Sequence, residues 1–327
     1  MVTNSASQNE GNKKYINIRE LTQYLGLLVV LVVMCILFGM LSNHFLSASS
    51  FSTIANQIPA LAVMAVGMTF VLIIGGIDLS VGSVLAFSGA VMSVAVVQWG
   101  LPIPVGIVLA LLTGIACGAF TGCISVFLRI PAFIVSLGML EIARGGAYSA
   151  TGSRTEYVGG NIALLTDPLI AGISPAFILA VFVVILGHIL LTKTVLGRQL
   201  IGIGTNEEAM RLAGINTYIP KIAVFMLMGF LSALGALFQV ARMEAADPNA
   251  GVGMELSVIA AVVIGGTSLM GGRGSVLASF FGVLIIAVLE AGLAQIGASE
   301  PTKRIITGIV IIIAVVFDMY RTRKAKK

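Results

Sequence analysis

The chain alternates between long apolar runs and short connections rich in polar residues and glycine. Because about 20 consecutive apolar residues cross a membrane as an α-helix, these runs predict about ten spans. The expected bounds of the spans are 22–41, 53–75, 81–98, 103–128, 131–150, 174–193, 219–241, 255–267, 275–297 and 303–320. Prolines such as Pro102 and Pro220 mark helix boundaries, because proline fits poorly inside a helix. The pattern predicts an all-α, polytopic helical membrane protein.

The composition agrees with this fold class and excludes a soluble protein. Of the 327 residues, 58% are hydrophobic and only 10% are charged, whereas soluble domains carry about 25% charged residues. Much of the net charge of +5 lies in the basic tail 321–327, so it is no sign of nucleic-acid binding. We expect three parts: a polar segment 1–21, a transmembrane domain over 22–320, and that tail.

Positive charges predict the orientation of the spans. With an even number of spans and both termini in the cytoplasm, most of the 19 lysines and arginines fall on the cytoplasmic side. This is the bias that membrane proteins show. Residues 194–218 then form the main cytoplasmic loop, and residues 151–173 and 242–254 lie outside.

A glycine-rich hairpin occurs twice in the chain. Residues 74–86 carry a Gly-Gly pair and then Gly-Ser-Val-Leu-Ala, and residues 264–278 repeat both elements. Paired glycines allow a membrane helix to break and neighbouring helices to approach closely. Both turns are expected at or near the cytoplasmic side, so the two copies are parallel. The structural hairpin residues are Gly75, Gly76, Asp78, Ser80, Gly82, Gly265, Gly266, Gly272 and Gly274.

Asp78 is the carboxylate of the first hairpin, and the second copy has Thr267-Ser268-Leu269 in its place. A carboxylate among apolar spans is a functional candidate by default, so Asp78 is a possible proton or cation site. Alternatively, Asp78 and Ser80 accept hydrogen bonds from free amides at the start of the next helix. The second reading is favoured, because the repeat lacks the carboxylate.

The loop 194–218 contains a short amphipathic helix. Asn206 can cap a helix that begins with Glu207 and Glu208, and Gly214 can end it. Such a helix rests either on the lipid interface or in a groove of a soluble partner; the residues alone leave both open. The segment comprises Asn206, Glu207, Glu208, Ala209, Arg211, Leu212 and Gly214.

A few polar groups interrupt the spans. Asn56, Gln57, Glu290 and Gln295 could line a polar path or make hydrogen bonds that pack helices. Glu141 and Arg144 stand three residues apart and can pair on one helical face.

Glycines spaced by four, at positions 114, 118 and 122, predict a close helix contact, either internal or at a dimer seam. No phosphate-binding loop, zinc-protease motif or serine nucleophile elbow occurs in the sequence. We therefore expect neither an enzyme nor a protein with a cofactor or metal of its own.

Three motifs together make the chain recognisable: MTFV leading into GGIDLSVGS, the loop GTNEEAMRLAGIN, and IGGTSLMGGRGS. In order and spacing they resemble the ribose-type family of bacterial ABC-importer permeases, which includes arabinose, xylose, galactoside and autoinducer-2 permeases. The resemblance implies a homodimer in the cell inner membrane, surrounded by lipid. It also implies a cytoplasmic ATPase, which binds the ATP, and a periplasmic sugar-binding protein.

By the same resemblance, residues 206–214 are the coupling helix that docks on the ATPase. The external loops become candidates for contact with the binding protein through Arg154, Glu156, Arg242, Glu244 and Asp247. The leading expectation is a sugar permease driven by a separate ATPase. One alternative is an ion-coupled secondary transporter that uses Asp78, and another is a membrane-embedded interaction subunit without a substrate path.

Overall fold

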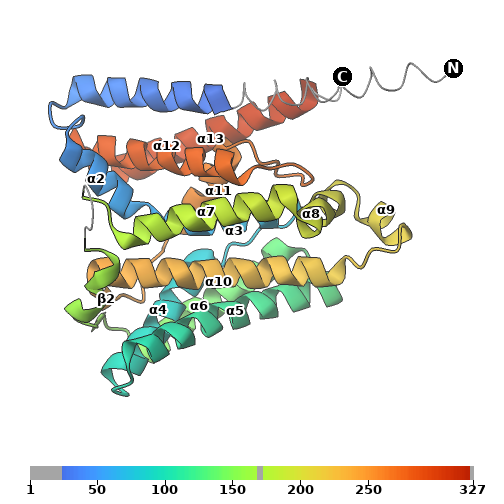
Figure 1. Cartoon of the computed structure of the whole chain (residues 1–327), viewed down its shortest axis with the longest axis horizontal. Helices are drawn as coiled ribbons and strands as arrows, with labels where there is room; N and C mark the ends of the chain where they lie inside the picture. Colours follow the sequence, from blue (N-terminus) through green and yellow to red (C-terminus); the bar gives the residue numbers. More distant parts are fainter. Residues whose placement is uncertain (1–23, 168–171, 325–327) are drawn as a thin grey trace.

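The computed structural model describes residues 24–167 and 172–324 and is built almost entirely from α-helices (Figure 1). The polar segment 1–21 and residues 325–327 of the basic tail lie outside the described residues. The helices are Tyr24–Leu41, α2 (Ala48–Gln57), α3 (Pro59–Ile73), α4 (Val81–Val97), α5 (Ile103–Phe127), α6 (Ala132–Thr151), α7 (Pro175–Lys193), α8 (Val195–Thr205), α9 (Glu207–Leu212), α10 (Tyr218–Met243), α11 (Met254–Ile264), α12 (Val276–Gln295) and α13 (Glu300–Lys324).

Several helices are long and apolar enough to cross a membrane. Among the described residues there are five such helices, or six if the bent pair of α2 and α3 counts as one span. The ten expected segments do not all meet this criterion: α4 and α11 are apolar helices of only 17 and 11 residues. Each of them borders a hairpin loop. The chain is an all-α membrane protein with broken helices.

The second expected span is bent. It starts earlier than expected, at Ala48, where the Ser47 hydroxyl accepts a hydrogen bond from the Ser50 amide at 3.2 Å. The axes of α2 and α3 then differ by 48°. Pro59 opens α3, where its missing N–H costs little and its fixed φ suits a first helical position.

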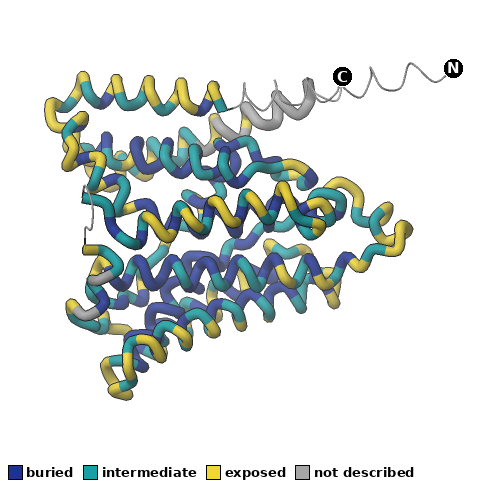
Figure 2. The backbone as a smooth tube through the Cα atoms, viewed as in Figure 1, coloured by how far each residue is buried: buried dark blue, intermediate teal, exposed yellow. Residues whose placement is uncertain are grey.

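The core surrounds α3, whose fifteen residues are all buried. Figure 2 shows the buried segments running through the middle of the molecule. The glycines of α5 pack against α10: a Cβ at Gly118 would overlap the carbonyl oxygen of Phe225, and one at Gly114 would lie 2.6 Å from the Ala233 Cβ. The close contact predicted from their spacing is confirmed, and it lies inside the protomer.

One end of the molecule carries a two-stranded antiparallel sheet (Figure 1, left). Strand β1 (Glu156–Tyr157) pairs with β2 (Ala245–Ala246), with Glu156 opposite Ala246. The strands belong to the two loops predicted to lie outside, so these loops share one side of the protein. The 3₁₀-helix η1 (Gly160–Leu165) follows β1.

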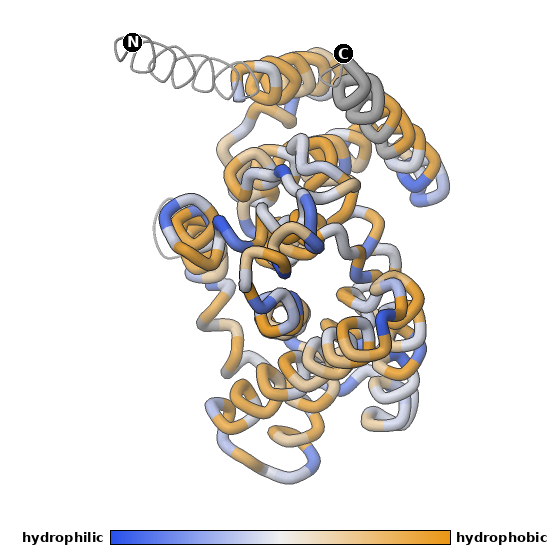
Figure 3. Tube along the Cα trace, turned by 90° about the vertical axis from the view of Figure 1, so that its right-hand side faces the viewer, coloured by the Kyte–Doolittle hydropathy of each residue, from blue (hydrophilic) through white to orange (hydrophobic). Residues whose placement is uncertain are grey.

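The opposite end carries α8 and α9. Figure 3 views the molecule from this end, roughly along the helix axes. Hydrophobic residues predominate on the helices in this view, and hydrophilic stretches are short and concentrated in the connections. This distribution is expected where lipid, rather than water, surrounds the helices.

Arg144 of α6 has partners other than the expected one. No ion pair between Glu141 and Arg144 is found among the described residues. Instead, the Arg144 guanidinium donates to the carbonyl oxygens of Pro248 and of Ala250, the latter at 2.9 Å. The direct contact that their spacing allows is therefore not formed. A guanidinium satisfies two carbonyls of an irregular segment that lacks helical hydrogen bonds, and this ties α6 to the loop before α11.

Candidate functional site

The predicted cytoplasmic loop forms two short helices. Thr194 caps α8, and Asn206 is the single residue between α8 and α9. The Asn206 side chain accepts a hydrogen bond from the Ala209 amide at 3.0 Å, so it is an N-cap. Gly214, with φ of 79°, ends the turn, and its amide donates to the Arg211 carbonyl at 2.9 Å.

None of the residues that the structure describes covers the outer face of α9. No residue of α9 is buried, and Leu212 is 84% exposed. Met210 points inward and lies over Gly202 of α8. Figure 1 shows α9 projecting beyond the ends of α5 and α10. An exposed apolar residue in this position marks an interaction surface.

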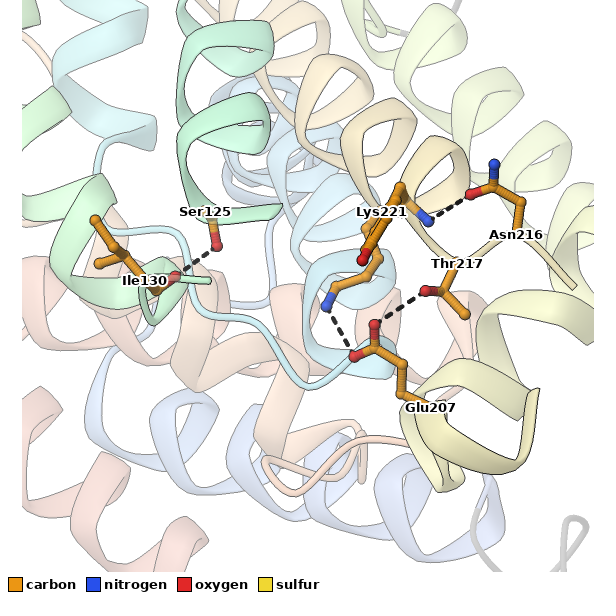
Figure 4. Close-up of polar contacts among 7 residues, drawn as sticks. Ser125, Ile130, Glu207, Asn216, Thr217 and Lys221 are labelled. Carbon is orange, nitrogen blue, oxygen red and sulfur yellow. Dashed lines mark hydrogen bonds and ion pairs between the residues drawn. The ribbon is translucent and has the colours of Figure 1, made fainter. Parts of the chain in front are cut away.

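Glu207 anchors α9 to the membrane helices (Figure 4). Its carboxylate pairs with the Lys221 ammonium at 3.0 Å and accepts a hydrogen bond from the Thr217 hydroxyl at 3.0 Å. Partial burial raises the pKa of Glu207, but Lys221 and Thr217 together hold it below its usual range. The negative charge is therefore retained at the point where α9 starts.

Asp78 lies in the loop between α3 and α4 and is buried. Its carboxylate accepts hydrogen bonds from the Ser80 amide at 2.9 Å and from the Ser80 hydroxyl at 2.6 Å. Ser80 itself makes no side-chain bond to the start of α4. Asp78 thus closes a turn immediately before the helix. The expectation that the Ser80 hydroxyl accepts a hydrogen bond from an amide of α4 is wrong, because that hydroxyl donates to Asp78 instead.

The two hairpins share one turn geometry. In hairpin 1 (residues 59–97), Gly75 has φ of 76° and the Gly76 amide donates to the Val71 carbonyl at 2.9 Å. In hairpin 2 (residues 254–295), Gly266 has φ of 83° and the Thr267 amide donates to the Val262 carbonyl at 3.2 Å. Gly75 and Gly266 are therefore equivalent, because both occupy the left-handed position of a helix C-terminus.

The hairpins differ after that turn. The outgoing helix of hairpin 1 starts at Val81, so Ser83 already lies within it. In hairpin 2 the helix starts at Val276, and the Ser275 hydroxyl accepts a hydrogen bond from the Ala278 amide at 3.3 Å. The loop of hairpin 2 is consequently longer, and it extends toward α8.

The four residues proposed for a polar path are arranged in two ways. Asn56 is tied to the segment before α7, since its carbonyl accepts from the Ser174 amide at 2.9 Å. Gln295 donates to the Ser50 hydroxyl at 2.8 Å and so joins α12 to α2. Gln57 and Glu290 are exposed on the protomer. Asn56 and Gln295 thus hold helices together. Gln57 and Glu290 present polar groups at the surface of the protomer.

The five charged residues of the external loops meet around the β1–β2 sheet. The Glu156 carboxylate accepts from Gln98 at 2.8 Å, and that of Glu244 accepts from the Tyr157 hydroxyl at 2.8 Å. Asp247 closes a turn by accepting from the Asn249 amide at 2.8 Å. The two arginines, Arg154 and Arg242, are exposed. The three acidic groups thus help to order the loops from which the arginines project.

Sequence reasoning missed two groups that hold hairpin 1 and α8 in place. The Ser136 hydroxyl of α6 accepts from the Leu79 amide at 3.1 Å. Gly204 of α8 lies directly against backbone atoms of both hairpins. The small side chain of Gly204 near a helix end could have indicated a close contact. The contact of Ser136 could not be predicted, because its partner is 57 residues away in the sequence.

Long apolar helices, together with hairpins broken at paired glycines, define a multi-pass membrane protein. The chain belongs to the family described as the permease component of the branched-chain amino acid transport system, which matches residues 50–315. It is therefore a transport permease and a multi-pass protein of the inner membrane.

Relatives with similar sequences are named as sugar permeases. The ribose import permease of Escherichia coli K12 is 38% identical over 320 residues, which cover 95% of this chain and 98% of the relative. The ribose import permease of Haemophilus influenzae is 38% identical over 298 residues, 89% of this chain and 92% of the relative. The fructose import permease of Rhizobium meliloti is 32% identical over 307 residues, 90% and 84% of the two chains. No solved structure matches this chain.

Proposed function

We propose that this chain is the membrane subunit of a binding-protein-dependent ABC importer that moves a monosaccharide, ribose or a similar sugar, into the cytoplasm. The observation that carries the proposal is the near full-length similarity to ribose import permeases. The chain supplies a path through the membrane, and a separate ATPase supplies the energy. We further propose that two copies of the chain form the path.

Both termini are proposed to be cytoplasmic, with about ten spans when the short helices α4 and α11 are counted. Two observations support this orientation. The helix Tyr24–Leu41 starts and α13 ends at the end of the molecule that carries α9 (Figure 1). Among the described lysines and arginines outside the long helices, Arg198, Arg211 and Arg273 belong to α8, α9 and the loop of hairpin 2, which lie at that end.

The ATPase is proposed to dock on α9. The exposed Leu212 offers it an apolar contact, and Arg211 a positive one. Closure of the ATPase upon binding ATP would displace α9 and repack the spans around the path. Substitution of Arg211 by glutamate should then uncouple ATP hydrolysis from uptake, while the protein remains in the membrane in normal amounts.

The binding protein is proposed to dock at the opposite end, around the β1–β2 sheet. Arg154 and Arg242 are exposed there and suit an acidic surface. Reversal of the charge at Arg154 should raise the concentration of binding protein needed for half-maximal uptake. The effect should shrink at high salt, because salt screens exposed charges.

The proposal is tested by reconstitution into lipid vesicles with the ATPase and the binding protein that co-purify with the chain. Uptake of labelled ribose should require hydrolysable ATP and should be unaffected by a protonophore. Uptake driven by an ion gradient without ATP would instead establish a secondary transporter, for which Asp78 is the candidate coupling residue. Mass spectrometry of the sugar retained by the binding protein identifies the substrate.

A further inference from the structure

Three segments that are far apart in the sequence meet through backbone atoms at the α9 end of the molecule. They are the end of α3, the end of α8, and the loop of hairpin 2. The Gly272 amide donates a hydrogen bond to the Ile73 carbonyl at 2.8 Å. Gly204 lies against both partners: a Cβ there would overlap the Ile73 oxygen and lie 2.6 Å from the Gly272 nitrogen.

The loop of hairpin 2 is equally close to its neighbours. A Cβ at Gly271 would lie 2.8 Å from the Gly204 oxygen and 3.2 Å from the Gly75 Cα. One at Gly272 would lie 2.6 Å from the Thr205 hydroxyl oxygen. Both loop glycines have positive φ, 83° and 74°, which disfavours side chains there in any case. The three segments are therefore in contact without an intervening layer of side chains.

This contact is mechanically stiff. Side chains can absorb a small displacement by changing rotamer, but backbone atoms in van der Waals contact cannot, and close-packed interiors transmit strain. Only Thr205 and Asn206 separate Gly204 from the start of α9. A displacement of α9 therefore reaches the ends of α3 and of the hairpin 2 loop within two residues.

We infer that Gly204 and Gly272 are positioning residues that form a rigid joint, which carries the movement of α9 to both broken hairpins at once. The inference rests on the proposed function, because it assumes that a partner moves α9. The joint is held in place by α8 itself, whose Leu200 and Ile203 are buried. It also gives the longer loop of hairpin 2 a role.

The test compares Gly204→Ala with a matched helical substitution, Gly138→Ala in α6. Alanine favours helix over glycine by about 1 kcal/mol at both positions. Only Gly204 has backbone atoms in the way, because nothing lies within 4 Å of a Cβ at Gly138. Three quantities are measured in vesicles containing the ATPase and the binding protein: the amount of folded permease, the rate of ATP hydrolysis, and sugar uptake per ATP hydrolysed.

A second pair of variants separates the contact from backbone strain. Gly272→Ala and Gly100→Ala both place alanine at positive φ, 74° and 66°. A Cβ at Gly100 meets nothing within 4 Å, whereas one at Gly272 meets Thr205. Any effect shared by the two variants is due to φ alone.

If the joint carries the movement of α9, Gly204→Ala and Gly272→Ala should lower sugar uptake per ATP hydrolysed by about fivefold or more. This is the lower end of typical coupling strengths. The amount of folded permease should fall for Gly204→Ala because its Cβ overlaps backbone atoms, but basal ATP hydrolysis per folded molecule should persist, and both controls should couple like the wild type. Uptake per ATP equal to that of the controls would overturn the joint. A fall in folded protein with unchanged uptake per molecule would do the same, because it shows a merely structural contact. If wild-type vesicles show no ATP-driven uptake, the proposed function itself fails.

Discussion

The Glu207 carboxylate and the Lys221 ammonium lie 3.0 Å apart and connect the first residue of α9 to the first turn of α10. The rest of α9 is exposed or half-buried, so this pair and the Thr217 hydroxyl orient a helix of only six residues. Helices this short are not stable alone in water, so their orientation depends on such local contacts.

The pair predicts how the stability of this region depends on pH. The folded pKa of Glu207 is below its usual range, so the ion pair stabilises the fold above the unfolded pKa of ~4.3. The stabilisation is lost as the pH falls through the lowered pKa. We expect Glu207→Gln to cost about 0.5 kcal/mol at pH 7, typical of a partly exposed pair, with the difference from wild type vanishing in acid. Thermal unfolding in detergent across that range measures it.

Glu208→Gln is the control for this prediction. Glu208 is the next residue and is exposed. Its substitution removes the same charge at the same end of α9, but not the pair with Lys221. Equal pH profiles for the two variants would show that the charge, and not the ion pair, matters.

The cap of α9 gives a second prediction. Asn206→Ala removes the acceptor of the Ala209 amide, which should cost about 1 kcal/mol and loosen α9. Asn206→Asp keeps the acceptor and should retain coupling. The ratio of uptake to ATP hydrolysis in vesicles should fall for alanine and remain near wild type for aspartate. Loss of coupling in both variants would point to a direct contact of the amide group with the partner.

The helices of this protein were largely predictable from the sequence. A long apolar run inside a membrane must satisfy its own backbone hydrogen bonds, and an α-helix does this. The break at Ile58 and Pro59 was hidden within an apolar run, since proline at a first helical position does not stop the pattern. The β1–β2 pairing and the partners of Arg144 were not predictable, because they join segments about a hundred residues apart. The contacts of Gly204 depend on how three segments pack together. The hydrophobic pattern along a single helix does not show which other segments will pack against it.

The α5–α10 contact gives a third prediction. Gly118→Ala places a Cβ against the Phe225 carbonyl, a backbone group that cannot rotate away, and should destabilise the fold by about 1–3 kcal/mol. Gly145→Ala in α6 is the control, since nothing lies within 4 Å of its Cβ. Its helix propensity should leave stability equal or slightly higher. Melting temperatures in detergent compare the two; equal values would mean that α5 and α10 can separate at no cost.

Variants of Asp78 distinguish a structural role of its carboxylate from a direct role of its charge in transport. Its carboxylate closes the turn before α4 through the amide and hydroxyl of Ser80. Asp78→Asn keeps an acceptor oxygen at this position, whereas Asp78→Ala leaves two buried donors unpaired at about 1–3 kcal/mol each. If the carboxylate is structural, the asparagine variant should retain much of the ATP-driven uptake and the alanine variant should be depleted from the membrane. Complete loss of uptake by the asparagine variant at normal abundance would instead establish that the charge itself takes part in transport.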